Sequence, residues 1–166
     1  MNSVEIAIRM ETDAIRFYTE ASARIKNAVG RKMFLSIAAD EKRHLELLSQ
    51  LLHGLDLTAA DASPMQGLRT VFEEMKGAMM ERAEAEADDI DAFRIAMLME
   101  SEGKEFYRKA ALSAPTEKEK KLFERLVFEE EQHYAVFSNT YHFMKDTGNW
   151  FMWEEHSIVD GGTPWA

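Results

Sequence analysis

The sequence predicts an all-α protein, a bundle of two duplicated helical hairpins. Three observations support this fold class. Apolar residues recur at the three- and four-residue spacing of amphipathic helices, and period-two alternation is nearly absent. Good helix formers dominate, with breakers near Gly30, between Gly54 and Pro64, and at Pro115. The sequence also resembles itself at an offset of 89 residues.

The internal repeat relates the first half of the chain to the second. Residues 7–18, AIRMETDAIRFY, align with residues 96–107, AMLMESEGKEFY. At the same offset, residues 31–48 align with residues 120–137. We therefore expect each half to form one antiparallel pair of long helices, and the two pairs to pack as a four-helix bundle.

Turn signals separate the expected elements. The first two long helices should reverse direction around 26–30, and residues 56–66 are typical of a loop. Residues 67–83 follow as a short amphipathic helix within a long crossover. Pro115 ends the third long helix because proline cannot continue it. Residues 116–119 match a capping box that opens the fourth.

The last segment differs from the bundle. Residues 147–166 contain all three Trp residues and lack helical periodicity. We expect a bundle domain over residues 1–146, followed by an aromatic tail that packs on the bundle or on a partner subunit. For Glu155 and His156 within this tail, packing is favoured over metal binding.

Composition excludes several classes of function. The 20 Lys and Arg residues against 30 Asp and Glu residues give a formal charge of −10, with no basic cluster for nucleic acid or an anionic membrane. The absence of Cys excludes disulfides, iron–sulfur clusters and thiolate chemistry. No uninterrupted apolar stretch is typical of a signal peptide or a membrane span, so a cytoplasmic protein is expected. Any metal must be held by His and carboxylates.

Two Glu-x-x-His motifs stand at equivalent positions of the repeat. Glu41 precedes His44 by three residues, and Glu130 precedes His133 by three. Side chains at this spacing share one helix face and can bind one ion. One such motif alone is more often a surface ion pair, so the prediction of a metal site depends on their recurrence and on the hairpin geometry.

The hairpin arithmetic brings four carboxylates to one level. Glu11 and Glu41 each lie 15 residues from position 26, and Glu100 and Glu130 each lie 15 residues from Pro115. At a rise of 1.5 Å per residue, this level is about 22 Å from each turn. We therefore expect four Glu and two His side chains to meet in one layer inside the bundle.

The charge of that layer predicts a dinuclear metal site. Four carboxylates buried together are unstable without compensation, because desolvation and repulsion both oppose their ionisation. Four ionised Glu and two neutral His side chains have a net charge of about −4, which two divalent ions balance. Oxygen-rich sites with imidazole suit iron or manganese, whereas structural zinc prefers sulfur and nitrogen ligands.

These residues resemble the ferritin-like di-iron carboxylate proteins, nearest the rubrerythrin and bacterioferritin branches, over about residues 2–146. The resemblance implies a ferritin-like four-helix bundle with a long crossover and two iron ions as cofactor. The implied ligand roles are terminal for Glu11 and Glu100, bridging for Glu41 and Glu130, and one nitrogen per ion for His44 and His133.

Three features depart from the family pattern. Without cysteine the chain has no rubredoxin-like domain, so its electrons must come from an unidentified donor. Rubrerythrins proper have a second Glu one turn after the third-helix ligand; here Gly103 stands there, matched by Ala14, which implies a symmetric centre with room for an oxidant. Lys42 and Glu131 replace the haem-binding Met of bacterioferritins, so haem is not expected.

Two tyrosines are candidates for a supporting role. Tyr18 and Tyr107 each follow the ligand Glu of their helix by seven residues, which returns to nearly the same helix face. Both phenols should face the ligands of the opposite hairpin, where they would orient carboxylates or relay protons. Ordinary burial with any convenient acceptor is the alternative.

Two further pairs of the repeat receive a different interpretation. Asp40 and Glu129 directly precede the bridging Glu residues and are interpreted as solvated. His53 and His142 lie nine residues after a motif His, half a turn away from its face, and are interpreted as non-ligands.

The leading functional hypothesis is a di-iron oxidoreductase of peroxidase or ferroxidase type, acting on hydrogen peroxide or dioxygen as the resemblance implies. An O₂-activating hydroxylase or a dimanganese catalase on the same ligands remains an alternative, as does an iron storage or carrier subunit. A metal-free structural bundle is the remaining interpretation. The resemblance favours a homodimer.

Overall fold

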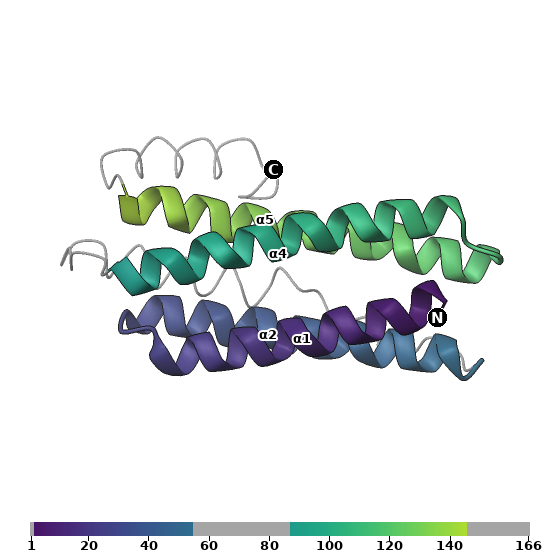
Figure 1. The fold of residues 1–166 in the computed structure, drawn as a ribbon, viewed down its shortest axis with the longest axis horizontal. Helices are drawn as coiled ribbons and strands as arrows, with labels where there is room; N and C mark the ends of the chain where they lie inside the picture. Colours follow the sequence, from purple (N-terminus) through teal and green to yellow (C-terminus); the bar gives the residue numbers. More distant parts are fainter. Residues whose placement is uncertain (1, 55–86, 146–166) are drawn as a thin grey trace, which may run out of the picture.

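The computed structural model describes residues 2–54 and 87–145, which form four long α-helices (Figure 1). Their bounds are α1 at Ser3–Arg24, α2 at Ala28–Leu52, α4 at Ala87–Leu112 and α5 at Glu117–Lys145. These described residues contain no strand. The prediction of an all-α protein with four long helices is confirmed.

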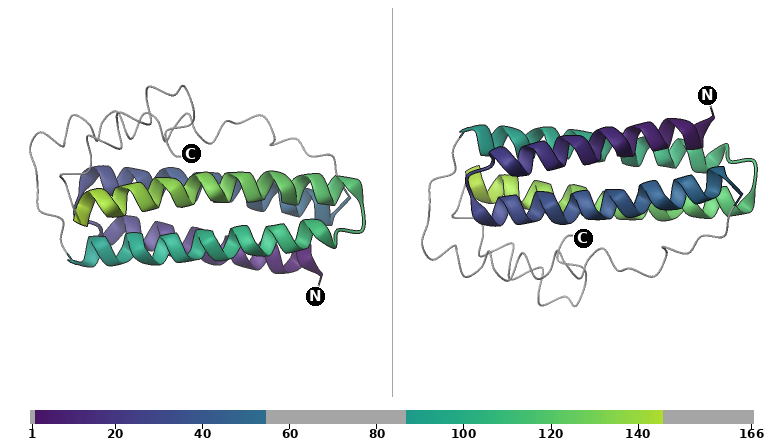
Figure 2. Two further views of the ribbon diagram at one scale, coloured as in Figure 1. Left: turned by 90° about the horizontal axis from the view of Figure 1, so that it is seen from above. Right: turned by 90° about the horizontal axis from the view of Figure 1, so that it is seen from below.

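The helices pair as two antiparallel hairpins, α1 with α2 and α4 with α5 (Figure 1). The hairpins pack with α1 against α4 and α2 against α5 (Figure 2). Their turns lie at opposite ends of the bundle, so α2 ends far from the start of α4 (Figure 1). This arrangement is the ferritin-like four-helix bundle that the repeat and the resemblance predicted.

Three predicted segments lie outside the described residues. These are the loop at 56–66, the crossover helix at 67–83 and the aromatic tail at 147–166, which includes Glu155 and His156. The domain boundary at residue 146 therefore stays a prediction. Among the helices of the described segments, none combines the length and hydropathy needed to cross a bilayer.

Capping side chains define the helix ends. Asn2 and Glu5 form a capping box at the start of α1, in which each side chain accepts a 2.9 Å hydrogen bond from the backbone N–H of the other. The side chain of Asn27 accepts hydrogen bonds from two backbone N–H groups in the first turn of α2. Thr116 Oγ1 accepts a 3.2 Å hydrogen bond from the backbone N–H of Glu119, as the predicted cap of α5 requires.

The turn between α1 and α2 is shorter than predicted. α2 begins at Ala28, so Gly30 lies inside this helix and does not break it. A Cβ atom at Gly30 would lie 3.2 Å from Cγ2 of Ile25 and 3.4 Å from the ring of Phe93. The glycine is therefore explained by close packing against the turn and α4, and the cap at Asn27 starts the helix.

A buried carboxylate joins the second hairpin to the turn of the first. Asp89, near the start of α4, is only 2% exposed. It accepts hydrogen bonds of 3.2 Å from the backbone N–H groups of Lys26 and Asn27. Asp89 thus satisfies N–H groups that a chain reversal leaves without helical partners.

Apolar side chains form two buried clusters, one on each side of a polar layer. The cluster near the α1–α2 turn includes Tyr18, Phe34, Ile37, Phe93 and Phe137. The cluster near the α4–α5 turn includes Ala7, Leu47, Tyr107, Phe123 and Leu126. The polar layer between them contains Glu11, Glu41, His44, Glu100, Glu130 and His133, each at most 5% exposed.

Candidate metal centre

Each long helix brings one glutamate to the middle of the bundle. Glu11 lies 13 positions before the end of α1, and Glu41 lies 13 positions after the start of α2. Glu100 and Glu130 are 12 and 13 positions from the α4–α5 turn. Because the arms of both hairpins are nearly equal, the four carboxylates arrive at one level.

The six side chains form two overlapping groups of potential metal ligands. In each group, one donor atom from each of four residues lies within 4.8 Å of the others. The groups are Glu11, Glu41, His44 and Glu130, and Glu41, Glu100, Glu130 and His133. Glu41 and Glu130 belong to both groups, which suits bridging ligands, whereas Glu11 and Glu100 belong to one each, which suits terminal ligands.

Both imidazoles direct Nδ1 into the cluster. His44 Nδ1 lies 2.8 Å from Glu41 Oε2 and 3.3 Å from Glu130 Oε1. His133 Nδ1 lies 3.2 Å from Glu41 Oε1 and 3.4 Å from Glu100 Oε2. The two rings stack with centroids 5.7 Å apart. Each imidazole therefore belongs to one of the two groups, with Glu41 between them.

Five buried polar atoms of the cluster have no hydrogen-bond partner. They are Oε2 of Glu41, Nδ1 of His44, Oε2 of Glu100, Oε1 of Glu130 and Nδ1 of His133. Buried polar atoms without partners are rare and costly, and metal ions at the centre would satisfy them. Carboxylate oxygens with one imidazole nitrogen per group suit iron or manganese. The residues present therefore fit a pair of such ions.

In the metal-free chain the cluster favours bound protons. Burial, together with repulsion from Glu41, raises the pKa of Glu11 to about 7. Burial and repulsion from Glu41 and Glu100 raise the pKa of Glu130 well above its ordinary value. Burial also opposes ionisation of Glu41, but the two nearby imidazoles leave its pKa lowered. Glu41 is thus the ionised carboxylate between the histidines.

The carboxylates of the cluster also favour the protonated, charged form of both histidines. Burial disfavours the imidazolium form, but the surrounding carboxylates outweigh it and raise the pKa of His44 and His133 well above the usual value. A metal-bound imidazole nitrogen must be free of its proton. Metal binding at this centre therefore has to release protons.

Carboxylates of the opposite hairpin contact the outer nitrogens of both histidines. His44 Nε2 lies 2.5 Å from Glu129 Oε2, and His133 Nε2 lies 3.1 Å from Asp40 Oδ2. A proton held on Nε2 leaves Nδ1 available to a metal. The interpretation of Glu129 as solvated is wrong, since it is only 3% exposed. The Asp40 side chain is 15% exposed and nevertheless contacts His133. Their equivalent positions in the repeat are the signal from which a shared role could have been predicted.

Arg43 connects these two carboxylates, and its role was not recognised in the sequence. Its guanidinium lies 2.9 Å from Glu129 Oε2 and 3.6 Å from Asp40 Oδ1, with the Arg43 side chain 9% exposed. Arg125 adds a contact of 3.0 Å to Glu129. Although burial opposes ionisation of Glu129, His44 and Arg43 hold its pKa well below the ordinary value.

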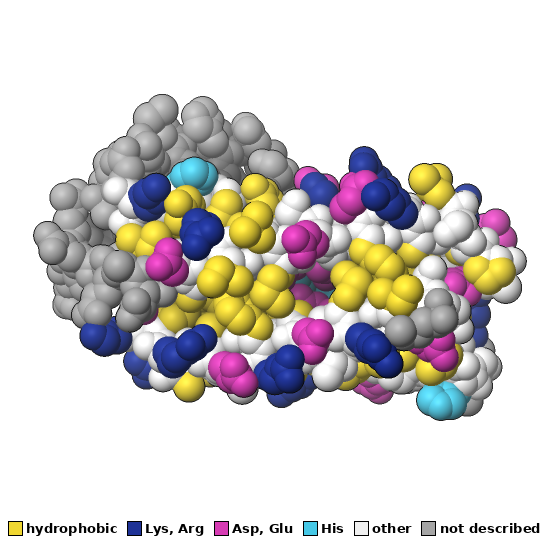
Figure 3. Space-filling view, viewed as in Figure 1, with side chains coloured by type: hydrophobic (Ala, Val, Ile, Leu, Met, Phe, Trp, Pro, Cys, Tyr) yellow, Lys and Arg dark blue, Asp and Glu magenta, His cyan; other side chains and the backbone are white. Residues whose placement is uncertain are grey.

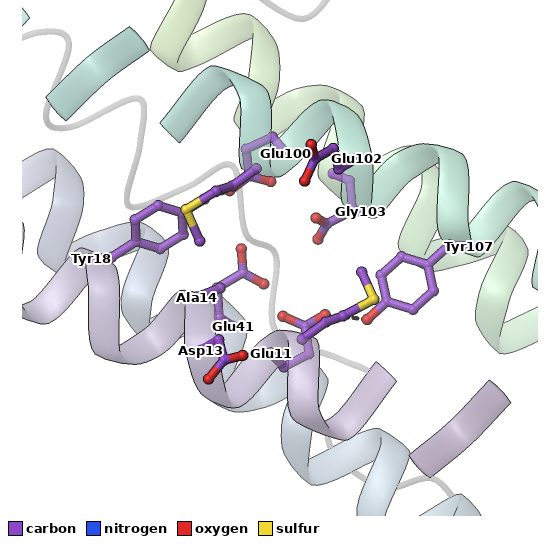
Figure 4. Close-up of a pocket in the computed structure, with 12 residues that line it drawn as sticks. Glu11, Asp13, Ala14, Tyr18, Glu41, Glu100, Glu102, Gly103 and Tyr107 are labelled. Atoms are coloured by element: carbon purple, nitrogen blue, oxygen red, sulfur yellow. Dashed lines mark hydrogen bonds between the residues drawn. The ribbon is translucent and has the colours of Figure 1, made fainter. Parts of the chain in front are cut away.

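Each predicted tyrosine donates a hydrogen bond to a terminal glutamate of the other hairpin. Tyr18 donates to Glu100 Oε1, and Tyr107 donates to Glu11 Oε1 (Figure 4). Burial and the nearby carboxylates raise the pKa of both phenols well above the usual value. Both tyrosines are therefore protonated donors at neutral pH, and they face the ligands of the opposite hairpin as predicted.

A pocket reaches the cluster through the face formed by α1 and α4. Figure 3 shows a hollow in this face, with acidic side chains at its floor and hydrophobic side chains on both sides. The cavity volume is about 170 Å³, and its walls include Met10, Ala14, Met99 and Gly103 (Figure 4). The pocket thus leaves space for a small molecule beside Ala14, as the sequence predicted, whereas an oxygen of the Glu130 carboxylate takes up the space directly beside Gly103.

The two histidines interpreted as non-ligands lie outside both ligand groups. His53 is at the end of α2, with Nδ1 2.7 Å from the backbone carbonyl oxygen of Ser49. His142 is exposed in the last turn of α5.

Comparison with known proteins identifies the family. The family model for rubrerythrin matches residues 2–141, which include all six potential ligands and both tyrosines. Searches of curated proteins and of solved structures found no significant match. Rubrerythrins are ferritin-like di-iron proteins, in agreement with the bundle and with the buried carboxylate and imidazole donors. The chain belongs to the rubrerythrin family.

Proposed function

We propose that this protein is a di-iron oxidoreductase of peroxidase or ferroxidase type that reacts with hydrogen peroxide or dioxygen. The main support is the set of unpartnered buried donor atoms, arranged in two four-residue groups that share Glu41 and Glu130. The ligands proposed to hold the two iron ions are Glu11, Glu41, His44, Glu100, Glu130 and His133. When bound, the iron pair supplies the two electrons that convert hydrogen peroxide and two protons into two water molecules.

The surrounding side chains hold the ligands in place. Tyr18 and Tyr107 each restrain one terminal glutamate through a phenol hydrogen bond. Asp40 and Glu129 hold the proton of each imidazole on Nε2, which directs Nδ1 toward the centre. The two phenols border the ligand layer and stay protonated because their pKa values are raised, so we assign them the role of keeping a hydrogen-bond donor fixed beside each of the two terminal glutamates.

The size of the pocket favours a small oxidant. A water molecule takes about 30 Å³ of liquid volume, and the cavity holds about 170 Å³. Hydrogen peroxide and dioxygen fit this volume easily, and so would a ring of about the size of benzene, whereas a much larger organic substrate would not. The residues that line the pocket include Met10 and Met99, so the approach to the centre is partly apolar.

Metal content per chain is the primary test. We expect two iron ions bound to the wild-type protein after anaerobic loading, and one or none in Glu130→Ala. Glu131→Ala is a matched control, because the Glu131 side chain is 61% exposed and forms an ion pair with Lys104 outside the ligand groups. Unchanged iron content in Glu130→Ala would contradict the proposed centre.

Reaction kinetics separate the proposed activity from its alternatives. The reduced, iron-loaded protein should be oxidised rapidly by peroxide or by dioxygen in stopped-flow experiments. A dimanganese catalase would evolve dioxygen from peroxide without any reductant, whereas a storage subunit would bind many more than two iron ions per chain. We also propose that the protein is a homodimer with a separate electron donor. Size-exclusion chromatography with light scattering tests the oligomeric state.

A further inference from the structure

Two guanidinium groups compensate the carboxylate behind one of the two histidines. Glu129 Oε2 lies 2.5 Å from His44 Nε2 and 2.9 Å from Arg43 Nη2. Arg125, four residues earlier on α5, places Nε 3.0 Å from Glu129 Oε1. The Glu129 side chain is 4% exposed, so salt and water screen these contacts little. Both oxygens of Glu129 are thus paired with a guanidinium, and two positive charges lie beside one negative charge behind His44.

The equivalent carboxylate behind the other histidine has weaker compensation. Asp40 Oδ2 lies 3.1 Å from His133 Nε2, and its Oδ1 lies 3.6 Å from Arg43 Nη2. The offset of 89 residues places Gln132 and Ser36 at the positions equivalent to the two arginines, and both are neutral. Gln132 is 6% exposed, and its Oε1 has no hydrogen-bond partner among the described residues. More negative charge therefore remains behind His133 than behind His44.

This difference in charge acts unequally on the two groups of potential ligands, the His44 group and the His133 group, which contain one imidazole each. Two guanidinium charges behind its imidazole oppose a dication in the His44 group, whereas a dication in the His133 group is attracted by Asp40. A carboxylate also strengthens the imidazole that it contacts as a metal ligand, and guanidinium partners of that carboxylate offset part of this effect. Both effects weaken the His44 group relative to the His133 group.

We propose that Arg43 and Arg125 make the two metal positions unequal, so that the His133 group binds the first ion and the His44 group binds the second. The inference rests on the metal centre of the proposed function. Neither arginine belongs to a ligand group, and both act on the ions through the charge of Glu129. The repeat by itself predicts two equal positions, and the two arginines remove that symmetry. At limiting metal, the chain then holds one ion in a defined place.

Stepwise loading of the wild-type protein tests the order. Calorimetric titration with Mn(II) in the absence of an oxidant should give two binding constants that differ by about tenfold or more. At one equivalent, electron paramagnetic resonance should show mainly single Mn(II) ions, with the spectrum of a coupled pair dominant only after the second equivalent. Crystals with one equivalent should show the strongest anomalous scattering beside His133 and Glu100. Two equal constants, or a first ion beside His44, would overturn the proposal.

Exchanging residues between equivalent positions isolates the role of charge. Arg125→Ser removes one guanidinium from Glu129, and we expect it to strengthen binding of the second ion by about threefold while the first changes little. Ser36→Arg places a guanidinium four residues before Asp40, as Arg125 stands four residues before Glu129. In the double variant with both changes, the first ion should bind in the His44 group. An unchanged order in the double variant would contradict the role of charge.

Two further variants separate charge from structure. Arg125→Lys keeps the positive charge, so the ratio of the two constants should stay close to that of wild type. Lys120→Ser removes one positive charge from the same helix, but its side chain is 45% exposed beside Glu124, so both constants should be unchanged. Circular dichroism checks that each variant keeps its helices. If Arg125→Lys behaves like Arg125→Ser, the charge is not the cause and the proposal is wrong.

The unequal positions and the proposed function fail separately. If the wild-type protein binds two ions with equal constants, or if the exchange of Ser36 and Arg125 leaves the order unchanged, the role of the arginines is wrong and the metal centre stands. If the wild-type protein binds no metal, the proposed function fails and the role of the arginines fails with it.

Discussion

Arg43 shows how one side chain outside the ligand set links the two halves of the centre. Its guanidinium contacts both Asp40 and Glu129, which in turn contact the two histidines. The repeat places Gln132 at the equivalent position in the second hairpin, so this cation has no counterpart there. The guanidinium compensates two carboxylates that would otherwise add negative charge beside the metal layer.

Replacing Arg43 should therefore destabilise the protein. In Arg43→Met, both carboxylates lose a partly buried cation, and we expect the free energy of unfolding to fall by about 2 kcal/mol. Urea denaturation of the metal-free protein measures this loss. Arg16→Met is the control, because the Arg16–Asp13 pair is about 70% exposed and should contribute less than about 1 kcal/mol. An equal loss in both variants would argue against the linking role.

Tyr107 tests the support of a terminal ligand. Tyr107→Phe removes the hydrogen bond to Glu11 and keeps the ring in its apolar surroundings. We expect two ions still to bind, with an affinity lower by about tenfold or more, because side chains that hold ligands typically contribute this much. Competition with a chelator of known affinity measures the change. Unchanged affinity would assign Tyr107 to packing alone.

The protonation of the ligands predicts how metal affinity depends on pH. In the metal-free protein, burial and repulsion raise the pKa of Glu11 to about 7, and those of Glu130 and both histidines also lie above their ordinary values. Protons occupy these groups below their raised pKa values and compete with the metal. Affinity for Mn(II) should therefore fall as the pH is lowered from about 8 to 6.

Calorimetry detects the released protons directly. Titrations of Mn(II) in two buffers with different ionisation enthalpies should give different observed heats at the same pH, in proportion to the protons released. Identical heats in both buffers would mean that the ligands are already deprotonated, contrary to the electrostatics of the metal-free site.

At the scale of the elements, the nearly equal arms of the hairpins determine where the site forms. Every helix carries its glutamate 12 or 13 positions from the hairpin turn. The connections between paired helices are short, and side chains at Asn27 and Thr116 define where α2 and α5 start. A turn that moved along the chain by one residue would shift a whole helix by about 1.5 Å and rotate its ligands by about 100°.

Asp89 should hold one of these turns in place. Asp89→Ala leaves two backbone N–H groups at the α1–α2 turn without their acceptor. We expect the free energy of unfolding to fall by about 2 kcal/mol, because each buried donor loses its partner. Chemical denaturation measures the effect, with Asp91→Ala as control since Asp91 is exposed and paired only with Arg94 within its own helix. A similar loss in both variants would contradict the role of Asp89.

At the scale of the whole molecule, the bundle separates a charged layer from water with two apolar clusters. Aromatic and aliphatic side chains fill the bundle on both sides of the ligands. This placement removes solvent from the carboxylates, which explains both their raised pKa values and their unpartnered atoms. The pocket between α1 and α4 is the opening through which a small oxidant would reach this layer.

Much of this arrangement follows from local sequence information. Helical periodicity and turn residues predict the four long helices, since both depend on neighbours within a few positions. The Glu-x-x-His pattern occurs once in each half of the repeat. This recurrence distinguishes the pairs Glu41 with His44 and Glu130 with His133 from accidental pairs. Residues seven positions apart share a helix face, so the spacing alone predicts that Tyr18 and Tyr107 face the glutamates of the opposite hairpin.

The sequence by itself determined the helices, their pairing and the level at which six donors meet. Only the tertiary structure decided what those donors contact across the bundle. Asp40 and Glu129 contact histidines of the opposite hairpin, Asp89 contacts a turn more than 60 residues away, and Glu130 lies beside Gly103. Such contacts depend on the rotation and separation of packed helices, which the spacing of residues along one helix does not specify.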